Sequence, residues 1–329
     1  MIIQLIVAFC VSLLATAAVG FFLVPALRRL KAGQSIREDG PVWHNAKQGT
    51  PTMGGLMFIA GTVISCLTVG YGRLKDGDLT LFLALVLAVI FAAIGFLDDY
   101  EKLRRKQNLG LTAKHKFAIQ LVVAVFFVLL MTMTGKLTTS LYIPFINVSV
   151  SLPAPVYYLF IVFVVVGTVN AVNITDGIDG LATGVSIPVA VCFALVALLW
   201  RAASAGIFSA ALAGALVAFL FFNFHPAKVF MGDTGSLFIG GAISAMALLM
   251  DMPLILIPLG IVYFVETLSD IIQISYFKLT KGKRVFKMAP IHHHFEMCGW
   301  SEYKLFIVFT AVSVVFAVLS YFGVSFRYG

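Results

Sequence analysis

Charged residues are scarce in this 329-residue sequence: Asp, Glu, Lys and Arg together make up 12% of it, whereas about 25% is usual for soluble domains. Hydrophobic residues make up 60%, and the mean hydropathy is +1.01. These values exclude an ordinary soluble globular domain. The net charge is +8, but the basic residues are confined to loops between apolar runs, so we expect no nucleic-acid partner.

Cysteine is also rare, with four residues in the whole chain. Cys10, Cys66 and Cys192 lie inside apolar runs, and Cys298 lies in a basic loop. This distribution is not that of a secreted, disulfide-stabilised fold, and we expect four reduced thiols. The sequence lacks an internal repeat and a recognisable soluble segment. We therefore predict a single integral-membrane domain over residues 1–329.

What the sequence has in abundance is apolar runs of about 20 residues, the length that crosses a bilayer as a helix. The runs are continuous rather than alternating, which excludes the strands of a membrane barrel. We predict an all-α polytopic membrane protein with about ten transmembrane helices. Their approximate bounds are 2–27, 53–72, 79–98, 116–135, 154–172, 183–200, 207–225, 236–251, 254–278 and 303–323.

The positive charges predict the orientation. Of the 23 lysines and arginines, 18 fall in the loops on one side of these spans, the side that the positive-inside rule places in the cytoplasm. Both termini are then expected on the outer, periplasmic or extracellular side. The outer loop 137–153 contains alternating apolar residues around Pro144 and Asn147. This pattern predicts a small β-hairpin near 140–152, with an unstructured loop as the alternative.

Three acidic segments stand at the predicted inner ends of spans. They are Asp98-Asp99, the Asp176-Gly-Ile-Asp179 stretch, and Asp233 within Gly-Asp-Thr-Gly-Ser. An aspartate at the bilayer centre costs roughly 2.5–3.5 kcal/mol on insertion scales, and adjacent carboxylates repel each other. Magnesium is typically held by one or two carboxylates together with substrate phosphates. We therefore predict that the segments meet on one membrane face and form a Mg²⁺-dependent phosphate site.

Other polar residues lie on the same predicted face. The glycine-rich loop 47–55, which contains Lys47 and Thr52, precedes the second span and has the backbone freedom for close approach to an anion. Lys102 and Lys114 are suitable partners for phosphate. Glu266 and Asp270 share one face of the ninth run, where a structural pairing and a functional groove both remain open.

The run His292-His293-His294 is unusual in this sequence. Successive residues do not share a helical face, so three histidines in a row make a poor zinc site. A site of His292, His294 and Cys298 is an alternative of low weight. Hydrogen bonding to an anionic substrate is the favoured interpretation.

Taken together, four segments resemble the phospho-N-acetylmuramoyl-pentapeptide transferase family, a branch of the polyprenyl-phosphate N-acetylhexosamine-1-phosphate transferase superfamily. They are Asp98-Asp99, 170–180, 223–236 and 289–294. The resemblance implies transfer of phospho-MurNAc-pentapeptide from UDP-MurNAc-pentapeptide to undecaprenyl phosphate. The products would be lipid I and UMP, in the first membrane step of peptidoglycan synthesis. It also implies Mg²⁺ as cofactor, a homodimer, and an active site on the cytoplasmic face of the bacterial inner membrane.

The resemblance further implies roles for single residues. Asp233 would bind Mg²⁺, Asp98 would deprotonate or position the lipid phosphate, and Asp99 would assist in placing that phosphate or the metal. The nucleoside and diphosphate pocket would be lined by Asn170, Asn173, Asp176, Asp179 and Phe230. The remaining substrate contacts would come from Lys47, Thr52, Lys102, Lys114, His292 and His293.

Alternatives remain at the level of sequence. A two-step route through an aspartyl phosphate is conceivable, although a single direct step is favoured. A polyprenyl-phosphate GlcNAc-1-phosphate transferase would use the same chemistry on another donor. An ion-coupled transporter with Glu266 and Asp270 as its coupling pair is a more distant alternative.

Overall fold

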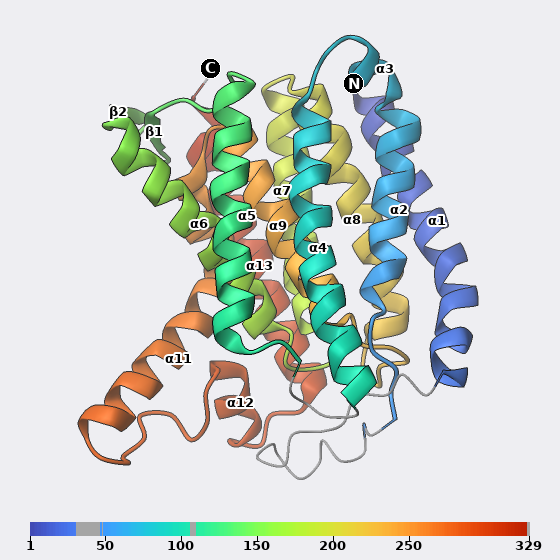
Figure 1. The fold of residues 1–329 in the computed structure, drawn as a ribbon, viewed down its shortest axis with the longest axis vertical. Coiled ribbons are helices and arrows are strands. Elements are labelled where there is room, and N and C mark those ends of the chain that lie inside the picture. Colours follow the sequence, from blue (N-terminus) through green and yellow to red (C-terminus); the bar gives the residue numbers. More distant parts are fainter. Residues whose placement is uncertain (31–46, 48, 106–109, 328–329) are drawn as a thin grey trace.

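Long helices that run between two ends of a bundle form most of the protein (Figure 1). The computed structural model describes residues 1–30, 47, 49–105 and 110–327. The loop cations Lys31, Arg37 and Lys106, which contribute to the predicted orientation, lie outside these residues. The long helices are α1 (Ile2–Arg29), α2 (Gly55–Val69), α4 (Thr80–Arg105), α5 (Ala113–Met133), α6 (Ala154–Thr175), α7 (Leu181–Leu199), α8 (Ala203–Asn223), α9 (Gly232–Leu249), α11 (Ile261–Leu279) and α13 (Glu302–Ser325).

The predicted all-α membrane architecture is confirmed. Among the described residues, eight helices are long and apolar enough to cross a membrane, or nine if one bent pair counts as a single span. The predicted run 53–72 forms the 15-residue helix α2, which is shorter than a typical span, followed by the short helix α3 (Tyr71–Lys75). The remaining short elements are η2 (Pro253–Ile255), α10 (Leu256–Leu259) and α12 (Ile291–Glu296).

Helix α9 occupies the centre of the bundle, where every residue from Thr234 to Leu248 is buried. It packs against α4, α6 and α2. Small residues make these contacts close: a Cβ on Gly240 would overlap the Val169 backbone, and a Cβ on Gly95 of α4 would overlap the backbone carbonyl of Asp233. Because Gly95 lies one turn before Asp98, this close approach of α4 and the start of α9 determines where the site forms.

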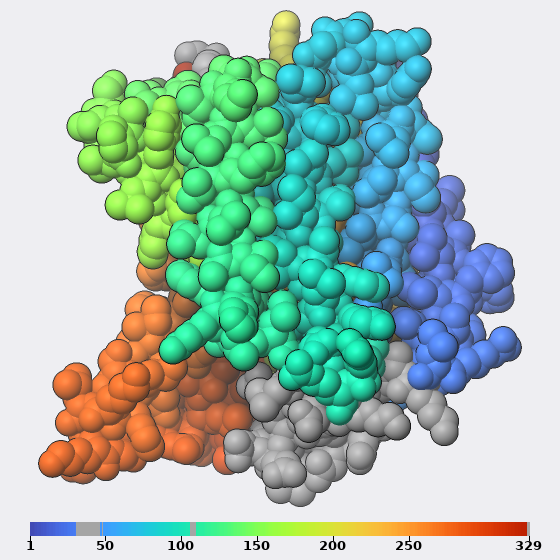
Figure 2. All heavy atoms as spheres, viewed as in Figure 1, coloured from blue at the N-terminus to red at the C-terminus, as the bar shows by residue number. Residues whose placement is uncertain are grey.

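The predicted ninth span, 254–278, is not one straight helix. The chain bends by 82° between Pro253–Leu259 and α11, and Gly260 lies at the break. Figure 1 shows α11 leaning away from the bundle, and Figure 2 shows it projecting beyond the outline of the other helices. One face of α11 carries exposed apolar side chains, among them Phe264, Leu268 and Ile271. The opposite face holds the buried Glu266 and Gln273.

A small hairpin covers the end of the bundle that is remote from α12 (Figure 1). Strands β1 (Ser140–Ile143) and β2 (Val148–Ser151) pair antiparallel, with Ser140 opposite Ser151, as the alternation in 137–153 predicts. The turn is attached to α13, since the Phe145 backbone N–H donates to the Gly323 carbonyl at 2.7 Å. Met1 and Asp251 line one cavity at this end, and Arg327 pairs with Asp251 at 2.9 Å. The first residue and Arg327 therefore lie at the same end of the bundle.

Candidate active site

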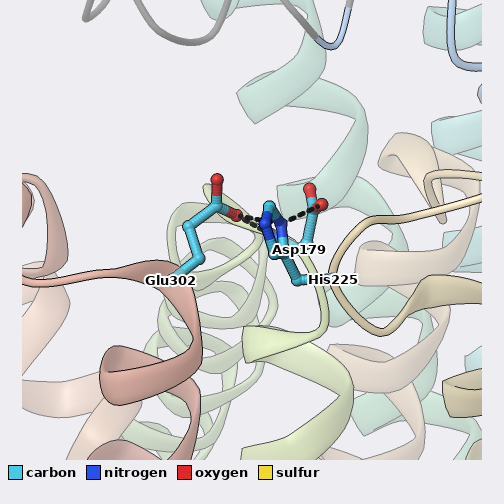
Figure 3. Close-up of side chains that lie close together, drawn as sticks. All are labelled: Asp179, His225 and Glu302. Carbon is cyan, nitrogen blue, oxygen red and sulfur yellow. Dashed lines mark hydrogen bonds and ion pairs between the residues drawn. The ribbon is translucent and has the colours of Figure 1, made fainter.

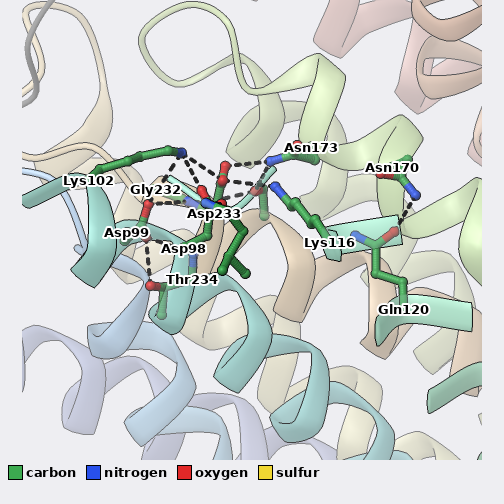
Figure 4. Close-up of polar contacts among 12 residues, drawn as sticks. Asp98, Asp99, Lys102, Lys116, Gln120, Asn170, Asn173, Gly232, Asp233 and Thr234 are labelled. Carbon is green, nitrogen blue, oxygen red and sulfur yellow. Dashed lines mark hydrogen bonds and ion pairs between the residues drawn. The ribbon is translucent and has the colours of Figure 1, made fainter. Parts of the chain in front are cut away.

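Three carboxylates from two helices converge at the other end of the bundle, which we call the site end. Asp98, Asp99 and Asp233 each offer one oxygen within 4.8 Å of the others (Figure 4). Asp98 and Asp99 are both 2% exposed and lie in the last turns of α4, whereas Asp233 lies in the first turn of α9. Aspartates 134 residues apart in the chain are thus brought into one cluster, as predicted.

Asp99 closes the N-terminus of α9. Its carboxylate accepts hydrogen bonds from the backbone N–H of Asp233 at 3.1 Å and from the backbone N–H and hydroxyl of Thr234 at 2.9 and 2.7 Å. A carboxylate at this position satisfies N–H groups that have no partner inside the helix and interacts favourably with the helix dipole. Gly232 makes the approach possible, because its φ is +69° and a Cβ there would overlap the Asp99 carboxylate. Both Asp99 oxygens are therefore already engaged.

Asp98 has a different environment although it is the next residue. One oxygen accepts the backbone N–H of Leu111 at 2.8 Å, and the other pairs with Lys102 at 2.6 Å. Lys102 lies one turn later on α4 and keeps 26% of its side chain exposed. The Asp98 carboxylate is therefore held by a partly exposed cationic side chain and a loop N–H rather than by a helix terminus, and a substrate phosphate can compete for that cation.

Asp233 is the centre of the cluster. Its Oδ2 atom pairs with Lys102 and Lys116, each at 2.8 Å, and its Oδ1 accepts from the Asn173 side-chain amide at 2.8 Å. The Asn173 amide also donates to Ser236. Four elements, α4, α5, α6 and α9, thus meet at one carboxylate.

Lys116 is a site residue that was not predicted. It lies two positions after Lys114, and residues two apart on a helix face different directions. The structure turns Lys116 toward Asp233 and leaves Lys114 exposed on the first turn of α5. The sequence contains no local signal for this choice, because it is the packing of α5 in the bundle that turns Lys116 toward Asp233.

The predicted Asn170 lies one turn before Asn173 and beside the cluster rather than in it (Figure 4). Its side-chain amide donates to Gln120 at 2.7 Å and to the Val166 carbonyl at 2.8 Å. These bonds join α5 to α6 and position Lys116 on the one helix relative to Asn173 on the other. Thr52 is 6% exposed, and its hydroxyl lies against Gly232.

A second charged cluster contains Asp179, His225 and Glu302 (Figure 3). Lys47 bridges Asp179 and Glu302, with both distances 2.7 Å, and the His225 Nδ1 lies 2.9 Å from Asp179 and 3.5 Å from Glu302. The Ala227 backbone N–H donates to Asp179 at 2.9 Å. Burial by itself would raise the pKa of Asp179, but Lys47 and these hydrogen bonds outweigh it, and the pKa is lowered.

A cavity of about 600 Å³ adjoins this second cluster. It is lined by Lys47, Asp179, His225, Phe230, Trp300 and Glu302, among others. The predicted Phe230 is fixed to the glycine-rich loop, because its backbone N–H donates to Pro51 and its carbonyl accepts from Gly54, both at 2.8 Å. The loop 47–55 and the segment before α9 therefore form one wall.

Asp176 stands between the two clusters, just after the end of α6. Burial raises the pKa of Asp176 to about 8, and repulsion from Asp233 and Asp99 acts in the same direction. An aspartate in this environment holds a proton near neutral pH unless a cation enters the site.

The three consecutive histidines have three different environments. His292 is fully buried and its Nδ1 lies 2.9 Å from Glu266, whereas the Nδ1 of His293 lies 2.6 Å from Glu296. His294 is a hydrogen-bond acceptor for the Lys287 backbone N–H at 3.1 Å. Within the described residues, the two groups with metal-ligand geometry are Asp98–Asp99–Asp233 and Asp179–His225–Glu302. Neither contains the alternative zinc ligands His292, His294 and Cys298.

The donor set at the site end suits a hard divalent cation. Carboxylate oxygens are what Mg²⁺ prefers, usually one or two of them with substrate phosphates. One oxygen of Asp98 and one oxygen of Asp233 pair with lysine ammonium groups. These ammonium groups lie where a metal cation would be expected among the carboxylates. In the second cluster, Lys47 already bridges both carboxylates, and the Asp179 carboxylate also accepts the Ala227 backbone N–H. The first cluster is therefore the better candidate for a metal.

Comparison with known proteins identifies the family. The sequence profile of glycosyl transferase family 4 matches residues 81–251, and the phospho-N-acetylmuramoyl-pentapeptide-transferase signature 1 matches residues 47–59. Curated phospho-N-acetylmuramoyl-pentapeptide-transferases are similar over nearly their full length. The protein from Halalkalibacterium halodurans is 46% identical over 96% of this chain and 96% of its own length. That from Caldanaerobacter subterraneus is 45% identical over 99% and 100%, and that from Listeria welshimeri 44% over 96% and 97%. The chain belongs to the phospho-N-acetylmuramoyl-pentapeptide-transferase family.

Proposed function

We propose that the protein transfers phospho-MurNAc-pentapeptide from UDP-MurNAc-pentapeptide to undecaprenyl phosphate, with lipid I and UMP as products. The observation that carries the proposal is the convergence of Asp98, Asp99 and Asp233 with Lys102 and Lys116 at the ends of three apolar helices. A lipid phosphate at the membrane surface and a water-soluble nucleotide can both reach such a position. Relatives at 44–46% identity over almost the whole chain bear the transferase name.

The reaction exchanges one phosphoanhydride bond for another. An oxygen of the lipid phosphate attacks the phosphorus that carries the sugar, the bond from this phosphorus to the UMP oxygen breaks, and UMP leaves with the electron pair. Phosphoryl transfer depends mainly on positioning and on neutralising charge. Lys102 and Lys116, which now share Asp233 Oδ2, are placed to neutralise the phosphates, and Asp98 is placed to orient or deprotonate the attacking one.

Magnesium is the proposed cofactor, with Asp98 and Asp233 as its protein ligands. Bound there, it would supply neutralising charge to the donor diphosphate. Asp99 acts by holding the start of α9, and hence Asp233, in place. Removing divalent metal with a chelator should stop turnover, and Mg²⁺ should restore it. Restoration by zinc alone would contradict this assignment.

The donor is proposed to extend from the carboxylate cluster into the neighbouring cavity. That cavity joins Asp179 and Phe230 to the loop that holds Lys47, and Asp176 lies between the two clusters. This geometry allows the diphosphate to contact the lysines while the nucleoside occupies the cavity. His293, which is 14% exposed beside Glu296, is more open to the sugar or peptide than the fully buried His292.

The test is a UMP-release assay with purified protein, undecaprenyl phosphate and Mg²⁺. UDP-MurNAc-pentapeptide should give UMP and lipid I. Release of UMP only when UDP-GlcNAc replaces this donor would identify a GlcNAc-1-phosphate transferase instead. Direct attack should produce no phosphorylated enzyme when acceptor is omitted, whereas a trapped aspartyl phosphate would establish the two-step route.

We also propose an orientation of the protein in the membrane and an oligomeric state. The site end is expected to face the cytoplasm of a bacterial inner membrane, because the nucleotide donor is made there and most loop cations flank this end. Labelling of a single cysteine placed in loop 137–153 from outside intact cells would check the orientation. A homodimer is expected from the family, and mass measurement in detergent would check it.

A further inference from the structure

Glu266 and Asp270 lie one turn apart on α11, but the structure separates their roles. Glu266 is fully buried, and its Oε2 lies 2.9 Å from the His292 Nδ1 and 3.4 Å from the His292 backbone N. Asp270, by contrast, is only half-buried. A fully buried carboxylate is costly unless it is paired. The hydrogen bond to His292 therefore offsets part of the cost of burying the Glu266 carboxylate.

This pair determines which nitrogen of His292 is left over. An ionised carboxylate only accepts hydrogen bonds, so the Nδ1 of His292 must carry the proton that it shares with Glu266. The other ring nitrogen, Nε2, is buried and has no hydrogen-bond partner among the residues that the structure describes, and the same holds for Glu266 Oε1. An unpartnered buried polar atom is destabilising, so the position of this nitrogen needs a reason.

The feature that meets Nε2 is the segment that joins α6 to α7. A Cβ built on Gly177 would overlap three atoms of the His292 ring, with Nε2 the nearest, and would meet no other residue first. Gly177 follows Asp176 and lies two residues before Asp179, so the edge of the imidazole supports the turn between the two clusters of the active site. Glycine is needed here for close approach.

We propose that Glu266 is a positioning residue of the active site: by fixing the tautomer and orientation of His292, it holds the Asp176–Gly180 segment in the geometry that receives the nucleotide donor. The inference rests on the proposed function for its kinetic consequence. It differs from the roles expected of the histidines from the sequence, because His292 acts on the loop and Glu266 acts through His292. The proposed contacts of the lipid phosphate are with Asp98 and the lysines, so the Glu266–His292 pair should not affect its binding.

The kinetic test compares isosteric variants. Glu266→Gln keeps the volume but can donate from its amide to Nδ1 and so place the ring proton on Nε2, toward Gly177. We expect kcat/KM for UDP-MurNAc-pentapeptide to fall roughly 10- to 100-fold, as for other displaced positioning groups, while KM for undecaprenyl phosphate changes little. Glu266→Asp, which keeps the charge, should recover part of the loss. Asp270→Asn is the matched control and should leave both KM values near those of the wild type.

A double-mutant cycle distinguishes positioning from general loss of structure. If Glu266 acts through His292, then adding Glu266→Gln to His292→Ala should produce no further change in the donor KM. Additive losses, an equal rise in both KM values, or the same defect in Asp270→Asn would overturn the proposal. Thermal unfolding in detergent accompanies each variant, and a Tm shift without a selective donor effect would also count against it.

A spectroscopic measurement tests the pair without any turnover. With ¹⁵N-labelled histidine, and His292→Gln to assign the signal, His292 of the ligand-free protein should show a protonated Nδ1, and Glu266→Gln should change that pattern. Absence of the change would overturn the assigned tautomer. If wild-type protein releases no UMP but this spectrum is as expected, the proposed function fails and the pairing stands. If wild-type protein is active and the Glu266 variants behave like it, the inference alone fails.

Discussion

The two ends of the bundle use their charged residues in opposite ways. At the end that carries the hairpin, Asp251 pairs with Arg327 at 2.9 Å and accepts from the Thr138 hydroxyl at 2.8 Å, and Asp78 accepts from the Ser204 hydroxyl at 2.6 Å. Each of these two carboxylates has partners of its own, and these bonds join separate connections at this end of the bundle. At the site end, three carboxylates crowd together and two lysines share a single oxygen of Asp233.

Burial sharpens this contrast. The Asp98 side chain is 3% exposed, whereas that of Asp78 is 35% exposed. Like charges that share a buried position are costly unless a cation neutralises them, and Lys102 and Lys116 do so at the site end. The contrast supports the proposal that charge at the site end serves phosphate chemistry, whereas the ion pairs and hydrogen bonds at the hairpin end hold connections together.

The largest expected effect comes from the centre of the carboxylate cluster. Asp233→Asn removes the charge that Lys102 and Lys116 share, and Asp98→Asn removes the group placed at the attacking phosphate. Each should reduce UMP release by about 10³-fold or more, since transition-state charge is then no longer matched. Near-normal turnover by either variant, measured on protein that elutes as a single folded species, would show that the two ends are not functionally different.

A smaller effect should separate two neighbouring lysines. Lys116→Ala removes an ion pair to Asp233, and we expect turnover to fall by about 10²-fold. Lys114→Ala, two residues earlier and exposed, should cause a clearly smaller loss. The two lysines lie within one turn of the same helix, so the two variants differ only in position. UMP release is measured for each variant. The reverse order would restore the assignment made from the sequence alone.

The next effect is on stability. Asp99→Ala removes the acceptor for the first N–H groups of α9, and caps of this kind are worth about 1–2 kcal/mol. Asp99→Asn keeps an acceptor oxygen and should lose less. Thermal unfolding of both variants in the same detergent measures the difference. If the two variants unfold alike, Asp99 does not act as the cap of α9.

The smallest effect is expected at the hairpin end. Burial would raise the pKa of Asp78, but its bonds to Ser204 and Thr80 and the charge of Lys136 lower it. A lowered folded-state pKa stabilises the protein above the ordinary aspartate value of 3.8, and the gain is lost as pH falls through the folded-state pKa. Asp78→Asn should therefore cost under about 1 kcal/mol at neutral pH, and the difference from wild type should disappear as the pH falls through the lowered folded-state pKa. UMP release at neutral pH should be unaffected, whereas a loss there would connect the two ends.

Part of this organisation is visible in the sequence because it depends on local pattern. Apolar runs predict helices wherever they are long enough, and the alternation around Pro144 and Asn147 predicts the hairpin that β1 and β2 form. The apolar run 254–278 also forms helix, but the pattern does not give its direction, because the chain bends by 82° beside Gly260. Composition measures whether a segment is apolar, but the direction of a helix depends on the neighbours against which it packs.

The sequence alone predicts a helical membrane protein with acidic segments at the ends of its spans, because hydrophobicity and the cost of burying charge act on each segment separately. The choice between nearby residues follows only from the folded structure: Lys116 rather than Lys114 contacts Asp233, Asp99 holds a helix terminus while Asp98 faces Lys102, and Glu266 rather than Asp270 pairs with His292. Chemically similar residues a few positions apart on one helix have similar local propensities. Which of them reaches a partner depends on the rotation of one helix against another, and that rotation is set by packing across the whole bundle.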